Sequence, residues 1–103
     1  MTEITITLPG TDLASRTSAA TVRYNVVGSV SAGNVVIIDL NAVESLSYSY
    51  ADELLCVLAA TQGFEWLIEK VKIVNTKQHV LRVIAEVINR RLKETGQPIR
   101  RSA

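Results

Sequence analysis

Residues 35–41 read VVIIDLN, and residues 45–55 read SLSYSYADELL. The first stretch is apolar almost throughout, which is typical of a central strand covered on both faces. The second is a serine-rich turn followed by apolar residues at helical spacing, which predicts the start of an amphipathic helix. Hydroxyl groups therefore lie near a helix N-terminus, just beyond the carboxyl end of a strand. In open sheets of parallel strands, functional groups gather at that end.

Further strands and helices are predicted on both sides of this stretch. Short alternating or continuous apolar runs predict the strands, and apolar residues three and four positions apart predict the helices. Ser15 or Thr17 can cap the first helix, and Gly63 follows the end of the second. The predicted order is a strand at 3–8, a helix at 14–27, a Gly/Ser loop at 28–33, a strand at 35–40, a helix at 49–61, a strand at 71–75 and a helix at 78–92. This β-α-β-α-β-α order predicts an α/β fold in which helices pack on a mainly parallel sheet.

The length of 103 residues suits one domain, which we place at residues 1–95. A Gly-Gln-Pro sequence breaks the last helix, so residues 96–103 are predicted to be a basic, disordered tail. Cys56 is the only cysteine, which excludes an intramolecular disulfide and a cysteine-based metal site. No apolar run reaches the roughly 20 residues of a membrane helix, and the N-terminus lacks the pattern of a secretory signal. We therefore expect a cytoplasmic protein with no membrane partner.

Charge is distributed unevenly along the chain, although the formal net charge is only +1. Residues 89–103 carry five basic residues and one acidic residue, so the rest of the chain is mildly acidic. A basic segment can contact nucleic acid or an acidic partner, or it can simply be a solvated tail. Against nucleic acid, only 5% of the residues are aromatic and no recognition motif is present. Nucleic-acid binding therefore stays an alternative function, which would use Arg90, Arg91, Lys93, Arg100 and Arg101.

The serines before the second helix have two interpretations. The sequence Ser49-Tyr50-Ala51-Asp52 fits the pattern Ser-x-x-acid, in which the serine hydroxyl caps the helix and stabilises it by about 1 kcal/mol. Alternatively, a phosphate at this position gains hydrogen bonds and a favourable helix dipole. Both interpretations of Ser49 stay open from chemistry alone.

Other polar residues offer little catalytic chemistry. Asp52 and Glu53 are adjacent and point about 100° apart on a helix, so they cannot form a catalytic dyad. Their negative charges stabilise the first turn of the helix, or they contact a partner. A triad of Ser49, His79 and Asp39 can be written, but the sequence has no Gly-x-Ser-x-Gly elbow. We therefore predict a protein that is not an enzyme. The sequence also has no glycine-rich phosphate loop, nucleotide-binding fingerprint or metal-ligand cluster, so no cofactor and no metal are predicted.

The central stretch resembles a known family. VIIDL at 36–40, then Val43, then SYSYADEL at 47–54 is similar to the STAS-like domain family of unknown function, which is related to the anti-sigma-factor antagonists. The typical member has Asp-Phe at the strand end, then Gly-Val, then Ser-x-Ser-Phe-Ala-Asp-Glu-Leu. Here Leu40 replaces the first Phe and Tyr50 the second. The resemblance extends over about residues 8–92.

The resemblance implies a bacterial signalling domain that binds an ATP-binding kinase-like or anti-sigma-type protein. Alignment from Asp39 without a gap places the phosphorylated second serine of the antagonists at Ser49, their aspartate at Ser47 and their glycine at Tyr50. Ser49 is thus the first candidate phosphoacceptor and Ser47 the second. Phosphorylation would add almost two negative charges beside the acids of the helix, so a bound partner would be repelled. The residues expected to contact that partner are Asp39, Tyr48, Tyr50, Asp52, Glu53 and Arg16, the last as a cation near the end of the sheet.

Overall fold

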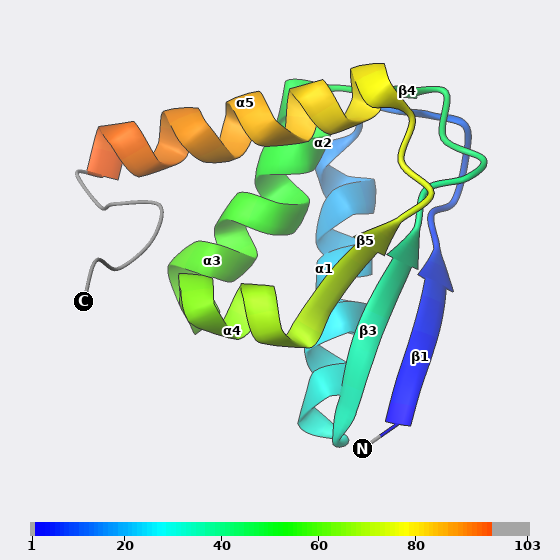
Figure 1. Cartoon of the computed structure of the whole chain (residues 1–103), viewed down its shortest axis with the longest axis vertical. Helices are drawn as coiled ribbons and strands as arrows, with labels where there is room; N and C mark the ends of the chain where they lie inside the picture. Colours follow the sequence, from blue (N-terminus) through cyan, green and yellow to red (C-terminus); the bar gives the residue numbers. More distant parts are fainter. Residues whose placement is uncertain (1, 96–103) are drawn as a thin grey trace.

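Three strands form the parallel sheet at the centre of the fold, as the alternating pattern predicts (Figure 1). The computed structural model describes residues 2–95. The strands are β1 (Thr2–Thr7), β3 (Asn34–Asp39) and β5 (Val71–Val74), in the order β1-β3-β5. The apolar stretch at 35–40 therefore supplies the central strand, as expected, and the predicted α/β class is confirmed.

The two faces of the sheet differ. Register pairs Ile6 with Ile38 and Ile38 with Ile73, so these three side chains share one face. That face belongs to the hydrophobic core, where Ile38 is only 1% exposed. Helix α1 packs on β3 on this side, and α4 contacts β3 and β5. The core therefore lies between the sheet and a single layer of helices.

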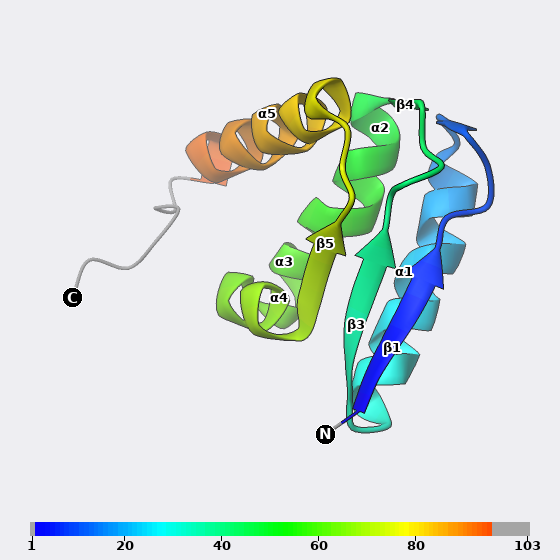
Figure 2. The ribbon, with the colours of Figure 1, turned by 45° about the vertical axis from the view of Figure 1, so that its right-hand side comes forward.

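The opposite face of the sheet corrects one prediction. It carries Thr5, Ile37 and Lys72 in register, and none of them belongs to the core. Lys72 instead reaches Glu3 across this face, with 3.8 Å between Nζ and Oε2. Figure 2 shows the strands in front of the helices, and no helix of the described residues 2–95 covers the outer face. The prediction that the central strand is covered on both faces was wrong, because the β-branched residues of β3 also suit a half-exposed face.

Helix α1 (Arg16–Ser31) is longer than predicted. Its N-cap is Ser15, whose hydroxyl accepts a hydrogen bond from the Ser18 amide, so one of the two predicted caps is confirmed. The buried residues Ala19 and Val22 face the core at helical spacing. Residues 28–31, predicted as a loop, continue the helix, because a glycine at an exposed helix position costs only about 1 kcal/mol. A short turn follows α1 and ends at Gly33, which has a positive φ of 98°.

The second predicted helix is one continuous helical segment made of three parts. They are α2 (Tyr48–Ala51), the π-helical turn η1 (Asp52–Cys56) and α3 (Val57–Gln62). Gly63, with φ 102°, ends the segment where predicted. A further helix that the pattern did not predict, α4 (Phe64–Lys70), follows directly and leads into β5.

Helix α5 (Gln78–Thr95) crosses the end of the molecule at which the strands finish (Figure 1). It buries Val80, Ile84 and Val87 at helical spacing, as predicted. The predicted tail at 96–103 lies outside the described residues. No helix within residues 2–95 is long and apolar enough to cross a membrane.

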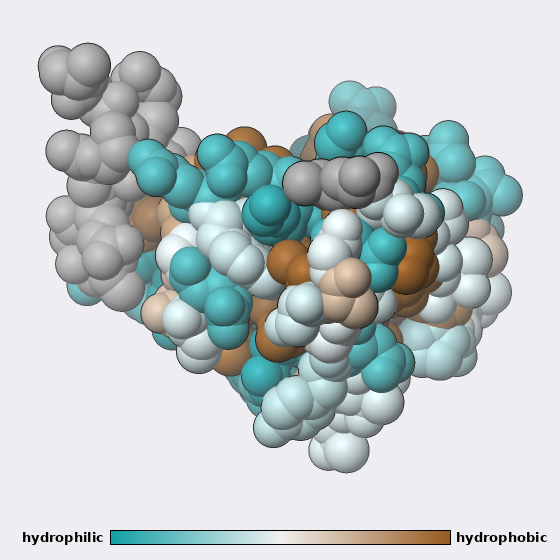
Figure 3. Space-filling model, turned by 90° about the horizontal axis from the view of Figure 1, so that it is seen from below, coloured by the Kyte–Doolittle hydropathy of each residue, from teal (hydrophilic) through white to brown (hydrophobic). Residues whose placement is uncertain are grey.

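The opposite end of the molecule, where the strands begin, has a mixed surface. Figure 3 shows apolar atoms there in separate small areas between hydrophilic ones. The largest exposed apolar residues of the described chain are also few, namely Tyr24, Tyr48, Ile68 and Leu81. The carboxyl end of the strands, where functional groups gather in parallel sheets, is therefore the place for a candidate site.

Candidate functional site

A short parallel ladder positions the serine turn. Strand β2 (Asp12–Leu13) pairs with β4 (Ser45–Leu46), and the Ser47 amide donates to the Leu13 carbonyl at 2.8 Å. The Ser45 hydroxyl donates to Asp12 Oδ1 at 2.7 Å. These contacts fix the turn against the segment that leads into α1.

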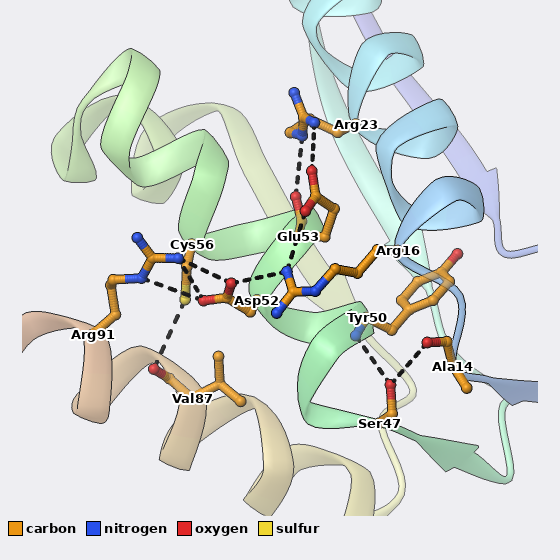
Figure 4. Close-up of polar contacts among 10 residues, drawn as sticks. All are labelled: Ala14, Arg16, Arg23, Ser47, Tyr50, Asp52, Glu53, Cys56, Val87 and Arg91. Carbon is orange, nitrogen blue, oxygen red and sulfur yellow. Dashed lines mark hydrogen bonds and ion pairs between the residues drawn. The ribbon is translucent and has the colours of Figure 1, made fainter.

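Ser47, and not Ser49, caps the helical segment. Its hydroxyl accepts a hydrogen bond from the Tyr50 amide at 3.0 Å and donates to the Ala14 carbonyl at 3.3 Å (Figure 4). The predicted cap at Ser49 was therefore wrong by two positions, because β4 ends at Leu46 and the helix starts at once. Both hydrogen-bonding roles of the Ser47 hydroxyl are occupied, so this serine has a structural role.

Ser49 lies in the first turn and lines a pocket. Within residues 2–95, no hydrogen bond to its hydroxyl is present, in contrast to Ser45 and Ser47. The pocket has a volume of about 280 Å³ between α1, the first turns of the helical segment and α5. Its walls contain three arginines and two carboxylates. The lining residues are Arg16, Tyr48, Ser49, Asp52, Val87, Arg90, Arg91 and Glu94.

Asp52 is held between arginines of two other helices (Figure 4). Arg91 Nη2 lies 2.9 Å from each oxygen of the Asp52 carboxylate, and Arg16 Nη1 lies 3.2 Å from Oδ2. Burial alone would raise the pKa of Asp52, but the hydrogen bonds from Arg91 and Arg16 outweigh it, so the pKa lies below its ordinary value. Asp52 is therefore a charged link between α1, η1 and α5.

Glu53 faces α1. Arg23 Nη2 lies 2.7 Å from Glu53 Oε2, and Arg23 Nε donates to the Glu53 carbonyl at 3.0 Å. Arg16 Nη1 also reaches Glu53 Oε1 at 3.2 Å. Asp52 and Glu53 therefore both contact Arg16 of α1, and only Asp52 also reaches Arg91 of α5.

Cys56 completes the η1 turn as a buried thiol. Its Sγ donates to the Val87 carbonyl at 3.8 Å, and the side chain is 2% exposed. Burial and the nearby Asp52 carboxylate raise the pKa of Cys56 to about 12. Because the thiolate is the reactive form, Cys56 is a packing residue.

The two tyrosines of the turn have opposite environments. Tyr48 is 39% exposed; its ring lies 5.0 Å below the Arg90 guanidinium, and its hydroxyl donates to Glu86. Tyr50 is fully buried, so the predicted contact between Tyr50 and a partner is wrong for this conformation. A bulky aromatic residue at this position faces the core because the cap at Ser47 sets the rotation of the helix.

Two of the three residues of the conceivable triad, Asp39 and His79, are held by other partners. Asp39 accepts from the Asn41 amide at 2.9 Å and from Asn75 Nδ2 at 3.1 Å, and these two contacts lower its pKa. His79 Nε2 contacts the Glu44 carbonyl. Neither Asp39 nor His79 lines the pocket at Ser49. The fold thus does not assemble this triad.

Sequence reasoning missed the roles of three arginines. Arg23 was not singled out, and Arg90 and Arg91 were considered only as part of a basic segment. The structure pairs Arg91 with Asp52 across 39 positions, a contact that no local pattern encodes. Of the rest of that segment, Lys93 is exposed on α5, and Arg100 and Arg101 lie outside the described residues.

The chain matches the model of a known family. The model of a family described as a STAS-like domain of unknown function (DUF4325) matches residues 18–81, more than half of the chain. This region contains the central strand, the serine turn and the helical segment after it. No curated protein and no solved structure gives a significant match.

Proposed function

Given that the chain belongs to the STAS-like domain family of unknown function, we propose that it is a non-enzymatic regulatory domain that binds a protein partner. By its resemblance to the anti-sigma-factor antagonists, the partner is an ATP-binding kinase-like or anti-sigma-type protein. The binding surface is formed by the serine turn and the first turns of the helical segment. Tyr48 and Arg16 are its most exposed members among the candidate residues. Contacts of Asp39, Asp52 and Glu53 with the partner stay predictions.

The free hydroxyl of Ser49 is the observation that carries the regulatory part of the proposal. Ser45 donates to Asp12 and Ser47 donates to Ala14, whereas the described chain offers Ser49 no hydrogen-bond partner. Phosphorylation of Ser49 therefore breaks no hydrogen bond of the fold. The Ser49 oxygen takes the γ-phosphoryl group of ATP from a kinase, loses its proton and releases ADP. The added charge then lies on the surface that the partner would cover.

Nucleic-acid binding is less well supported. Arg91 is paired with Asp52, and Arg90 stacks on Tyr48. Arg91 is therefore engaged in an ion pair within the domain, and no contact of the described residues favours this second function.

Capture of partners from the native cell tests the proposal. Wild-type protein, Ser49→Ala and Ser49→Asp serve as baits, together with a chain carrying phosphoserine at position 49. We expect a kinase-like ATPase on the first two baits, and its loss from the last two. With purified partner, the charged forms should bind at least tenfold more weakly, while their unfolding midpoints stay within a few degrees of wild type.

Ser31→Asp is the matched control, because Ser31 is exposed at the far end of α1. It adds the same charge away from the pocket and should bind the partner as wild type does. Equal affinity of wild type and the phosphorylated chain for the partner would contradict the regulatory role of Ser49.

A further inference from the structure

The pocket beside Ser49 is unusual in its charge. Three arginines line it, and only two carboxylates, Asp52 and Glu94, oppose them. The two carboxylates are unequal, since Asp52 already shares its charge with Arg91 and Arg16 whereas Glu94 is exposed at the pocket wall. A group with almost two negative charges therefore meets a surplus of cations here.

The three arginines differ in how strongly they are bound to carboxylates. Arg91 contacts Asp52 through two nitrogens, since Nη2 lies 2.9 Å from both carboxylate oxygens and Nε donates to Oδ1 at 3.3 Å. Arg16 makes two longer contacts of 3.2 Å, and its side chain is 52% exposed. Within residues 2–95, Arg90 forms no ion pair and lies only on the Tyr48 ring. Arg90 and Arg16 are thus the cations that a new anion can recruit.

We propose that Arg90 and Arg16 bind the phosphoryl group of phosphorylated Ser49 within the same molecule, so that the pocket is a built-in receptor for this modification. The inference rests on the proposed function in one respect, because it takes Ser49 as the phosphorylated residue. A tethered phosphate needs no high intrinsic affinity, since its attachment to the pocket wall gives it a high effective concentration. Guanidinium groups also match phosphate oxygens in a planar, two-pronged geometry.

Capture changes the surface in a way that simple repulsion does not. The phosphate covers Arg90 and Arg16 and draws Arg16 away from Asp52 and Glu53. A partner that recognises exposed arginine then loses its contact, and the helical segment keeps its position through Arg91 and Arg23. The modification thus hides positive charge as well as adding negative charge.

The second ionisation of the phosphate reports this contact directly. Phosphoserine is installed at position 49, and its pKa is measured by ³¹P NMR between pH 4 and 8. Nearby cations favour the dianion, so we expect the pKa to fall from about 6 to about 5 or lower. In Arg90→Gln and Arg16→Gln, each phosphorylated at position 49, it should rise back towards 6.

Arg82→Gln is the matched control. It removes the same charge from an exposed position of α5 that does not line the pocket, and it should leave the pKa unchanged. Circular dichroism spectra that match wild type confirm that each variant is folded. A pKa of about 6 or higher in the unsubstituted phosphoprotein, or the same pKa in all variants, would overturn the capture.

The outcome is separable from that of the proposed function, since the NMR titration needs no partner. Failure of capture leaves the loss of partner binding on phosphorylation intact. Successful capture with no kinase-like partner in the cell overturns the proposed function alone.

Discussion

The Tyr50 hydroxyl is buried and forms no hydrogen bond of normal geometry within the described chain, with the Ser18 side chain as its nearby polar group, although the ring is fully packed. Burial raises the pKa of Tyr50, so the group stays neutral at all ordinary pH values. An unsatisfied buried hydroxyl destabilises a fold by about 1–3 kcal/mol. The typical member of the resembled family has phenylalanine at this position, which fills the same space without the hydroxyl.

Tyr50→Phe should therefore stabilise the protein. We expect the free energy of unfolding to rise by about 1 kcal/mol, as measured by urea unfolding monitored by circular dichroism. Tyr24→Phe is the control: Tyr24 is 69% exposed, and its hydroxyl is solvated, so the stability should change by less than about 0.5 kcal/mol. A loss of stability in Tyr50→Phe would show that the hydroxyl has a partner in solution.

Single residues of the site were only partly predictable from the sequence. The capping rule correctly placed a serine before the helix, but it favoured Ser49 over Ser47, because an acidic residue follows Ser49 by three positions and tyrosine follows Ser47 at that spacing. Only the ladder between β2 and β4 decides between them, because it fixes where the extended chain ends. The helix that starts after Ser47 turns Tyr50 into the core, and no sequence pattern reveals that its hydroxyl is buried there.

At the scale of elements, the helices are joined by charge as well as by apolar packing. Asp52 in η1 binds Arg91 of α5 and Arg16 of α1. The pKa of Asp52 is lowered on folding, so its contribution to stability is fully present above the pKa of the unfolded chain, about 3.9. It is lost as the pH falls through the lower pKa of the folded state.

Asp52→Asn should thus destabilise the protein at neutral pH only. We expect a loss of about 1–2 kcal/mol at pH 7, since the carboxylate is only 19% exposed, and a difference from wild type that shrinks as the pH falls below about 4 and through the lowered pKa of the folded state. Urea unfolding at several pH values measures both. Glu65→Gln, which removes an exposed acid of α4, is the control and should stay within about 0.5 kcal/mol of wild type throughout. A difference for Asp52→Asn that stays the same size from pH 7 to pH 2 would contradict a role of the charge.

Helices and strands as such were predictable, but the contacts between them were not. Apolar spacing located α1, the helical segment from Tyr48 and α5 to within a few residues. The pattern gave no sign of α4, because seven residues are too few for a clear period. The π-helical turn was equally invisible, since it changes the backbone hydrogen bonds without changing the residues that face the core.

At the scale of the whole molecule, the fold is a two-layer arrangement with one free sheet face. The composition of β3 suggested two covered faces, because Val35, Val36, Ile37 and Ile38 are all apolar. Val36 and Ile38 belong to the core cluster, whereas Val35, at 9% exposed, and the half-buried Ile37 lie outside it on the other face. Sequence composition could not separate the two cases, since β-branched residues are favoured in strands on either kind of face.

Neighbouring isoleucines of β3 test this architecture. Ile38 is 1% exposed within the core, whereas Ile37 lies on the outer face beside Thr5 and Lys72. Ile38→Thr leaves a cavity and buries a hydroxyl, so we expect the free energy of unfolding to fall by about 3 kcal/mol. Ile37→Thr keeps the β-branched shape and exposes the hydroxyl to water, so the expected loss is about 1 kcal/mol or less. Urea unfolding of the two variants at one protein concentration gives the comparison.

Equal losses at the two positions would mean that something covers the outer face in solution. Repeating the measurement at tenfold lower concentration then identifies a second copy of the chain as the cover, because the loss at Ile37 would become smaller only if dissociation exposes it.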